Sequence, residues 1–364
     1  MNSVAERFIK IAFAGGGTAG HLNPAIALIE EITTYCSLKA LYFINPGKIE
    51  AKVLPARFPW IKTVPLRVKG FERPLHSVKN VVALSLLIPA LIKAMGELRK
   101  FKPDCVFCTG GYITGPVALA AWLLKIPVYL HEQNSVVGVA NRMSLRFAKR
   151  IFLSFPESLE TIPLKYKNKA IVTGNPVRKP KMEREELEMF MENLGLRGEK
   201  LILVMGGSRG SDFLNQMVEK IHDRIKARFI VLTGSSGWTE RLKHYPNVAP
   251  FDYLEEVPDL LSIVDIAITR GGATTVWELY TSGLPALIIP WEGATEGHQF
   301  LNAKFLERAG TARVLRESEA TADRVVRELS MLLNMKRRPS LDPNEILKKI
   351  LSGISEVRLK CFTT

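Results

Sequence analysis

Short apolar runs alternate with stretches of helical periodicity along the whole chain. The runs are typical of buried strands, and stretches with a period near 3.6 lie at 25–33, 117–124, 215–225 and 275–282. Strands that alternate with helices in this way predict an α/β protein with parallel sheets and right-handed crossovers. The predicted strands are Ile9–Ala14, Ala40–Ile44, Cys105–Thr109, Val128–His131, Arg150–Leu153, Ala170–Val172, Leu201–Met205, Phe229–Thr233, Asn247–Pro250, Ile266–Thr269 and Ala286–Pro290.

The same local pattern of strand, glycine turn and helix occurs twice. The run 8–14 is followed by Gly15–His21 and then by a helical pattern from Pro24, and the run 201–205 is followed by Gly206–Gly210 and a helical pattern from Asp212. Such a turn directs backbone N–H groups and the positive end of a helix dipole at one point, which suits a phosphate. Two such units predict two Rossmann-like domains with parallel sheets that face a deep cleft.

The segment 173–180 marks the expected domain boundary, because its prolines and glycine interrupt regular structure. A chain of 364 residues is long enough for two domains, which we place at 1–176 and 177–342. The tail at about 343–364 is mildly amphipathic, which leaves its packing partner open, and the first domain is one candidate.

The first half contains two candidate catalytic residues, His21 and Glu132. Gly15-x-Gly17-x-x-Gly20 matches a dinucleotide fingerprint, but the end of the second strand reads Phe43-Ile-Asn-Pro-Gly, without the carboxylate that binds a ribose, which disfavours NAD and FAD. His21 lies in the first turn of the predicted helix, where the dipole favours a neutral imidazole that can accept a proton. The alternative is a tight turn without a ligand.

Polar residues also follow two other strands of the first half. The segment 109–116 combines three glycines with Tyr112 and Thr114, and we expect its helix to begin at Pro116. The run 131–134 places four polar side chains after an apolar strand, where open α/β sheets bind ligands. This run contains Glu132, the one plausible acid or base of the cleft, and a network of hydrogen bonds between the domains is the alternative.

The second glycine turn allows two functions for Ser208. Gly206-Gly-Ser208-Arg-Gly210 matches the nucleophile elbow of hydrolases, and Asp265 and His298 follow in the appropriate order. The interpretation we favour is that Ser208 caps the helix and binds a phosphate through its hydroxyl group, because a hydrolase would not need the first domain.

A third glycine turn, 269–273, precedes the pattern Thr275-x-x-Glu278, which is a capping box or places a carboxylate at a ribose diol. No Asp-x-Asp occurs, and no His, Cys or carboxylate cluster has metal spacing, so we expect no metal and no other cofactor. A bound diphosphate would then be neutralised by helix dipoles and by Arg178 and Arg209.

The charge is uneven. Residues 1–155 contain 20 lysines and arginines against 8 acids, whereas residues 156–364 contain 30 against 28. A basic domain favours an anionic partner, and because no nucleic-acid-binding pattern is present we expect a membrane surface and no nucleic acid. The longest apolar run, 81–92, is too short to span a bilayer and contains Pro89. The segment 71–92 that includes it either contacts the membrane or is a buried helix. Cys105 and Cys108 are expected to be buried thiols in a reducing cytoplasm.

Taken together, the motifs resemble the MurG family, UDP-N-acetylglucosamine-dependent transferases of the GT-B fold that act in peptidoglycan synthesis on the lipid-linked muramyl-pentapeptide lipid I to make lipid II. The resemblance covers nearly the whole chain through GGGTAGHLNPAIAL, TGGYITGP, HEQNSVVGVANR, GNPVR, GGSRGSDFLNQ, RGGATTVWELYTSGLPALIIPW and GHQFLNA. It implies an inverting enzyme at the cytoplasmic face of the membrane, bound there peripherally. A UDP-sugar epimerase, a diacylglycerol glycosyltransferase, a serine hydrolase and a non-catalytic sugar-nucleotide-binding module remain alternatives.

The resemblance also implies roles for individual residues. His21 is the base or an electrostatic helper, and the donor UDP-N-acetylglucosamine meets residues of both halves. The implied donor contacts are Thr18, Ala19 and Gly20 with the diphosphate, Asn134 near the transferred sugar, Arg178 and Ser208 with the phosphates, Leu254 with the uracil, Ala273, Thr274 and Thr275 with phosphate and ribose, Glu278 with the ribose hydroxyls and Gln299 with the sugar. The chain departs from the family at His298, where glutamine is frequent and which we retain among the sugar-binding positions, and at Arg209, which replaces glutamine.

Overall fold

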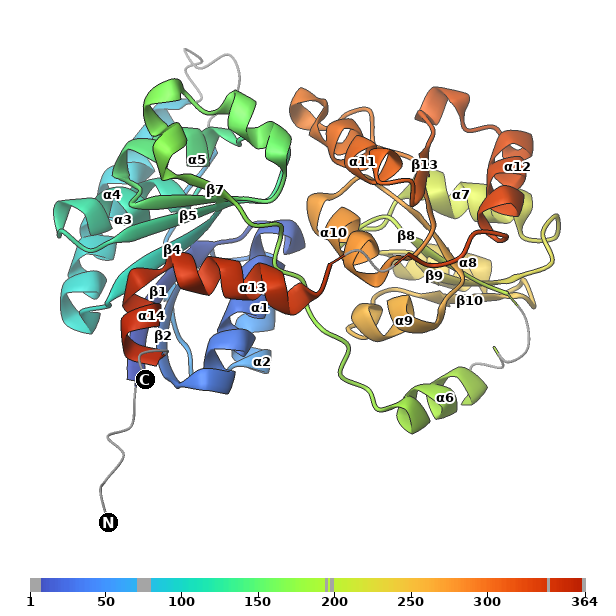
Figure 1. Cartoon of the computed structure of the whole chain (residues 1–364), viewed down its shortest axis with the longest axis horizontal. Coiled ribbons are helices and arrows are strands. Elements are labelled where there is room, and N and C mark those ends of the chain that lie inside the picture. The colour runs from blue at the N-terminus through green and yellow to red at the C-terminus, as the bar shows by residue number, and fades with distance from the viewer. Residues whose placement is uncertain (1–7, 71–79, 194–195, 197–199, 339–340, 362–364) are drawn as a thin grey trace. The chain divides into compact units, whose positions relative to one another are not determined.

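The computed structural model describes residues 8–70, 80–193, 196, 200–338 and 341–361. The chain divides into two compact units, one formed by 1–176 together with 344–364 and the other by 177–343 (Figure 1). Each unit is a parallel sheet with helices on both faces, so the predicted α/β class is confirmed.

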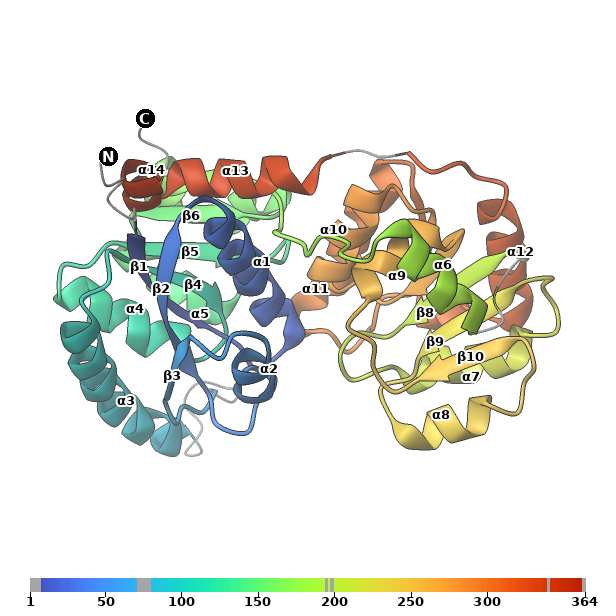
Figure 2. The ribbon, with the colours of Figure 1, turned by 90° about the horizontal axis from the view of Figure 1, so that it is seen from below.

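The first unit contains a seven-stranded sheet in the order β3-β2-β1-β4-β5-β6-β7. One face is covered by α3, α4 and α5, whose small apolar side chains pack against alternate strand residues such as Ala12, Val106 and Leu130. The other face carries an aromatic layer that includes Phe13, Phe107 and Phe152, under α1 and the C-terminal helices (Figure 2). The elements are β1 Phe8–Gly15, α1 Ala19–Tyr35, β2 Ser37–Ile44, α2 Ile49–Arg57, β3 Lys62–Pro65, α3 Asn80–Phe101, β4 Cys105–Gly110, α4 Thr114–Leu123, β5 Val128–Glu132, α5 Val139–Ser144, β6 Arg150–Leu153, β7 Ala170–Val172, α13 Pro343–Gly353 and α14 Ser355–Cys361.

The second unit contains a six-stranded sheet in the order β10-β9-β8-β11-β12-β13. Its core joins alternate residues of β8, β9 and β11 to the apolar faces of α7 and α12. The elements are α6 Arg184–Asn193, β8 Leu201–Met205, α7 Asp212–Ile221, β9 Arg228–Leu232, α8 Ser236–Leu242, β10 Val248–Phe251, α9 Val257–Ile263, β11 Ile266–Thr269, α10 Ala273–Ser282, β12 Ala286–Ile288, α11 His298–Arg308, β13 Ala312–Val314 and α12 Ala322–Leu332. In each unit two adjacent strands near the middle of the sheet lead into glycine turns, β1 and β4 in the first unit and β8 and β11 in the second.

All the predicted strands are present, with ends that shift by three residues or fewer. The sequence analysis missed β3 and β13, which are short edge strands with exposed residues such as Lys62 and Arg313. α1 begins at Ala19, so His21 lies in its first turn as predicted, whereas α4 begins at Thr114 rather than at Pro116. The proline inside α4 was taken for the first residue of the helix, because proline is frequent there.

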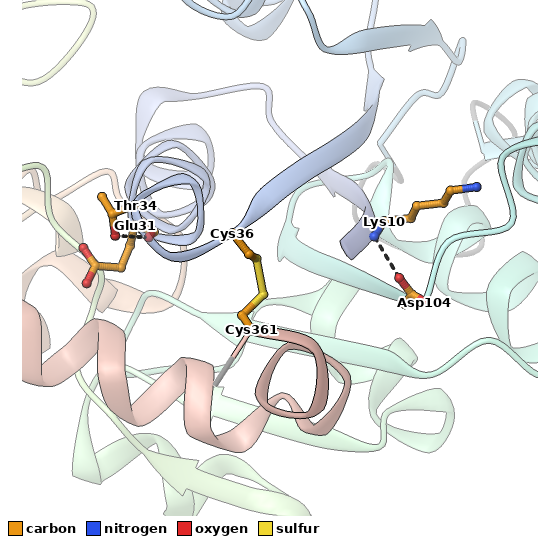
Figure 3. The surroundings of a disulfide bond; sticks show 6 residues. All are labelled: Lys10, Glu31, Thr34, Cys36, Asp104 and Cys361. Carbon is orange, nitrogen blue, oxygen red and sulfur yellow. Dashed lines mark hydrogen bonds between the residues drawn. A yellow bond between two sulfur atoms is a disulfide. The ribbon is translucent and has the colours of Figure 1, made fainter. Parts of the chain in front are cut away.

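The C-terminal helices are tied to the first unit by polar contacts and by a disulfide. Glu356 of α14 accepts hydrogen bonds from Tyr129 and from Nζ of Lys149, the latter at 2.7 Å. Cys361, at the end of α14, is bonded to Cys36, with 5.6 Å between the Cα atoms (Figure 3). Nothing in the sequence pairs these cysteines, which are 325 residues apart.

Cys105 and Cys108 are buried free thiols, as predicted. Burial raises the pKa of both thiols, so both are protonated and unreactive near neutral pH.

Candidate active site

The first glycine turn holds His21 against Gly110, at the end of β4. Oγ1 of Thr18, the residue before α1, lies 3.1 Å from Nδ1 of His21. The His21 carbonyl accepts a 2.6 Å hydrogen bond from Oγ1 of Thr109. A Cβ atom added to Gly110 would lie 3.1 Å from Nε2 of His21. The partly exposed imidazole is therefore oriented by Thr18 through Nδ1, and its Nε2 faces the end of β4.

This orientation allows proton transfer at Nε2. When Nδ1 donates its hydrogen to Oγ1 of Thr18, Nε2 of the neutral ring carries the lone pair that accepts a proton. Ala19 and Gly20 form the first turn of α1 beside His21 and are partly exposed, and Thr18 itself is exposed. The structure thus brings together the residues predicted around the first turn, and the role of His21 as a base stays a prediction.

A buried carboxylate that the sequence analysis missed lies beneath this turn. Oε2 of Glu50 accepts a 2.8 Å hydrogen bond from the N–H of Gly17, and Oε1 accepts one of 3.1 Å from the N–H of Asn45. The side chain comes from the first turn of α2 and is fully buried. The end of β2 carries no carboxylate, as the sequence indicated, but this acid stands six residues beyond it and reaches back. Both of its oxygens are engaged by backbone N–H groups, so it is not available to a ribose.

Glu132 organises the loop that follows β5. Oε1 accepts hydrogen bonds from the backbone N–H of Asn134 at 3.0 Å and from its side-chain amide at 3.3 Å. Oε2 accepts from the N–H of Gly138 at 3.0 Å and from Nδ2 of Asn141 at 2.8 Å. Burial raises the pKa of Glu132, and the four hydrogen bonds oppose this shift. With both oxygens engaged by its own loop, Glu132 is better suited to position Asn134 than to transfer protons.

The polar run 131–134 therefore forms a hydrogen-bonded network inside the first unit rather than between domains. His131 is fully buried, and burial lowers its pKa to about 4, so the ring is neutral at pH 7. Its Nδ1 lies 2.9 Å from Nε2 of Gln133. Asn134, the predicted contact of the transferred sugar, is the member of the run that is partly exposed.

Ser208 does not cap the helix after the second glycine turn, so that prediction is wrong. The residue before α7 is Ser211, whose side chain accepts a hydrogen bond from the N–H of Leu214. Ser208 and Arg209 lie exposed in the turn, so both remain accessible to a ligand. The turn is longer than the sequence analysis assumed, and the cap lies three residues later.

The serine hydrolase alternative is contradicted by the position of Asp265. Asp265 precedes β11, and its carboxylate accepts hydrogen bonds from Nζ of Lys200 at 2.7 Å and from the N–H of Leu201 at 2.9 Å. Ser208 follows the opposite end of β8, which is parallel to β11. A five-residue strand separates the two by about 15 Å. Asp265 therefore cannot belong to a triad with Ser208.

The third glycine turn gives Glu278 an unusual environment. α10 begins at Ala273 after Gly272, without a side-chain cap, so the predicted capping box of Thr275 and Glu278 is wrong. Glu278 is buried in the second turn of α10, and burial raises its pKa to about 7 although the positive charge of Arg178 opposes this shift. Because helix α10 starts two residues before Thr275, Glu278 is free of the capping role and can receive a ligand.

Three further predicted donor residues lie near these elements. Nη1 of Arg178 donates a 3.2 Å hydrogen bond to the carbonyl of Glu255, the residue after Leu254. His298 and Gln299 form the first turn of α11, and a Cβ atom on Gly271 would lie 2.1 Å from the Gln299 carbonyl oxygen. The structure thus places Gln299 against the turn that precedes α10.

Arg270 is a second residue that the sequence analysis missed. It is buried, and its guanidinium donates to Oγ of Ser211 at 3.0 Å and to the carbonyl of Ile289 at 3.0 Å, and pairs with Glu317 at 2.6 Å. It connects the cap of α7 to the ends of β11 and β12, which fixes the second and third glycine turns relative to each other. An arginine directly before Gly271-Gly272 was the available signal.

Comparisons with known proteins cover both units. Residues 11–153 match the glycosyltransferase family 28 N-terminal domain, and residues 201–356 match the glycosyltransferase family 28 C-terminal domain. A UDP-N-acetylglucosamine--N-acetylmuramyl-(pentapeptide) pyrophosphoryl-undecaprenol N-acetylglucosamine transferase from Thermosipho africanus is 41% identical over 343 residues, 94% of this chain and 97% of the relative. The enzyme with the same name from Thermotoga neapolitana is 39% identical over 350 residues, 94% of this chain and 99% of the relative.

Solved structures share the fold. MurG of Acinetobacter baumannii aligns with a TM-score of 0.66 at 24% identity, over 95% of each chain. UDP-GlcNAc 2-epimerase from Neisseria meningitidis, bound to UDP-GlcNAc, aligns with a TM-score of 0.61 at 18% identity, over 96% of this chain and all of that chain. The two Rossmann-like units are thus those of the GT-B fold.

Proposed function

We propose that this chain, which belongs to the MurG family within glycosyltransferase family 28, transfers N-acetylglucosamine from UDP-N-acetylglucosamine to lipid I and so makes lipid II. The observation that carries the proposal is the arrangement of Thr18, His21 and Gly110, in which the imidazole is oriented through Nδ1 and its Nε2 lies beside a glycine that leaves room for the ring. The acceptor, a muramyl sugar on a pyrophosphoryl lipid, presents the hydroxyl group that attacks.

The proposed reaction is a single displacement with inversion at the anomeric carbon. His21 takes the proton of the attacking hydroxyl at Nε2 while the new C–O bond forms and the bond to the UDP oxygen breaks. Charge develops on the departing diphosphate, where the N-terminus of α10 and the guanidinium of Arg178 stabilise it. His21 belongs to the first unit, whereas Arg178, Ser208 and Glu278 belong to the second.

The proposal includes transfer without a metal ion, because helix termini and arginine replace the cation. Calorimetric titration with UDP-N-acetylglucosamine in buffer containing EDTA tests donor binding, and conversion of a lipid I analogue in the same buffer tests catalysis. Donor binding clearly tighter than that of UDP-glucose, together with product formation, is expected. Failure of every UDP compound to bind would contradict the proposed function.

We also propose that the protein binds peripherally to the cytoplasmic face of an anionic membrane through the first unit. Ile88 and Ile92 of α3 are each 65% exposed, and α3 packs on α4, whose last turn exposes Trp122. The adjacent α5 contributes Arg142 and Met143 to a hollow of about 260 Å³ that is also lined by Arg146 and Tyr166. Exposed apolar side chains beside arginines suit an anionic lipid surface.

Part of the predicted membrane segment, 71–79, lies outside the described residues. In the described part of this segment, Ala83 and Ala90 of α3 are buried, whereas Ile88 is exposed. One face of the helix thus packs in the first unit, and the exposed face supports the proposed membrane contact. Within the described part of the chain no helix combines the length and apolar character needed to cross a bilayer. Flotation with phosphatidylglycerol vesicles tests the proposal, with Ile88→Ser/Ile92→Ser expected to reduce binding and phosphatidylcholine vesicles as the control.

A further inference from the structure

Gln133 presents a buried hydrogen-bond acceptor that has no hydrogen-bond partner among the residues that the structure describes. The side chain is 2% exposed, and its Nε2 donates to the carbonyl of His131 at 3.2 Å and lies 2.9 Å from Nδ1 of the same residue. Because a carbonyl oxygen accepts only from the nitrogen end of the amide, these contacts fix the orientation of Gln133. Its Oε1 is buried without a hydrogen bond. Such atoms are rare in folded proteins and call for an explanation.

His131 keeps this orientation fixed. Its ring is neutral near pH 7, since burial lowers its pKa to about 4, and its Nε2 approaches the carbonyl of Gly174 at 3.4 Å. With the hydrogen on Nε2, Nδ1 is the acceptor that receives the amide hydrogen of Gln133. The chain of contacts from Gly174 through His131 thus directs Oε1 of Gln133 away from the network.

Oε1 of Gln133 and Nε2 of His21 border the same small space. A Cβ atom on Gly110 would lie 3.5 Å from this oxygen and 3.1 Å from this nitrogen. Gly110 has a φ of +100°, a conformation that glycine adopts readily and L-residues with a side chain rarely adopt. The absence of a side chain there leaves the two acceptor atoms facing one position at the end of β4.

We propose that Gln133 positions the acceptor sugar, an inference that rests on the proposed function. The attacking hydroxyl donates its hydrogen to Nε2 of His21, and a second O–H or N–H of the same sugar donates to Oε1 of Gln133. A sugar presents such donors on neighbouring carbons, which suits two acceptor atoms that border one space. The buried oxygen gains its missing hydrogen bond when this sugar is bound, and an analogue without the second donor leaves it unpaired.

The test combines Gln133→Met with a series of soluble muramyl acceptor analogues, each lacking one hydrogen-bond donor. Methionine has a similar volume and no acceptor of comparable strength. We expect Gln133→Met to raise the KM for the complete acceptor about tenfold while the Kd for UDP-N-acetylglucosamine changes less than twofold. For one analogue, the KM of the wild-type enzyme should be about tenfold higher than for the complete acceptor. The KM of the variant, which is already raised, should not rise further with this analogue. Gln216→Met, at an exposed position of α7, is the matched control and should behave as wild type.

Calorimetric binding of the acceptor analogues in the absence of donor separates the two proposals. If the wild-type protein binds the analogues but transfers no sugar, the proposed function fails while the binding series still decides the role of Gln133. If every analogue lost the same factor in acceptor affinity with the wild type and with the variant, the proposed role of Gln133 would be overturned. A changed Kd for UDP-N-acetylglucosamine would overturn it as well. If Gln133→Met does not fold, the analogues are measured with the wild-type protein alone. The role of Gln133 is then overturned if every analogue binds as tightly as the complete acceptor.

Discussion

The two glycine turns that lead out of the central strands look alike in sequence but differ in what fills them. Beneath the first, the buried carboxylate of Glu50 accepts the N–H of Gly17, so one backbone donor is already used. In the second, the helix is capped by Ser211, and Ser208 and Arg209 remain exposed. The motif therefore predicts the path of the backbone, but it does not predict whether the N–H groups are available to an anion.

This difference fits the proposed division between the units. With the N–H of Gly17 already bonded to Glu50, the first turn has one backbone donor fewer for an anion, which suits a site where His21 handles a neutral hydroxyl group. The open second turn, with a positive Arg209, suits the diphosphate of the donor. The predictions below test whether the two turns are as different as their contacts indicate.

The largest effect is expected at the first turn, from His21→Ala. Loss of the base should lower kcat by about 10²–10⁴-fold, and the Kd for UDP-N-acetylglucosamine should stay within about twofold. Steady-state kinetics and calorimetry measure the two quantities. Ser208→Ala in the second turn is the counterpart, and we expect it to raise the donor Kd with a smaller effect on kcat. A His21 variant that loses donor binding instead would assign this residue to the phosphates.

Glu50→Ala should lower the free energy of unfolding by about 2–4 kcal/mol, because it leaves the N–H groups of Gly17 and Asn45 buried without acceptors. Ser208→Ala should change it by less than about 0.5 kcal/mol, as expected for an exposed residue. Chemical denaturation followed by circular dichroism gives both values. Similar values for the two variants would mean that the carboxylate is not what holds the first turn.

Breaking the disulfide should affect the first unit alone, because Cys36 and Cys361 both belong to it. We expect Cys361→Ser to destabilise that unit by about 2–4 kcal/mol, since a cross-link between distant residues restricts the unfolded chain. Calorimetry with and without a reductant measures the change. The reductant should lower the melting temperature of the wild type and of the control variant Cys108→Ala, which both keep the disulfide, and should leave Cys361→Ser unchanged. Equal melting curves of the oxidised and the reduced protein would contradict the prediction.

The smallest effect concerns the pH dependence of donor binding at Glu278, whose pKa burial raises to about 7. The folded protein holds this proton more tightly than the unfolded chain does. The free energy of unfolding therefore falls as the pH rises from the pKa of this carboxyl in the unfolded chain through 7. Ribose hydroxyls donate to the ionised form, so donor binding should strengthen by up to about tenfold from pH 6 to pH 8. Glu278→Gln should remove this dependence, and calorimetry at several pH values would reveal any that persists.

Local patterns sufficed for most of the fold. The strands of both sheets are recognisable because buried strands are short apolar runs, and the prolines at 173–180 lie where the structure divides the chain, between Pro176 and Val177. The edge strands β3 and β13 lack that signal, because an edge strand needs little apolar surface. The exact helix starts were missed where proline or serine suits more than one position.

The sequence by itself determined the class of fold, the glycine turns and the position of His21 after the first of them, since these depend on residues close together in the chain. Only the tertiary structure decided what those turns meet: Glu50 beneath Gly17, Arg270 across the cap of Ser211, and the oxygen of Gln133 beside the His21 ring. These contacts join residues on different elements. Their geometry follows from sheet register and helix packing, which no local pattern of residues encodes.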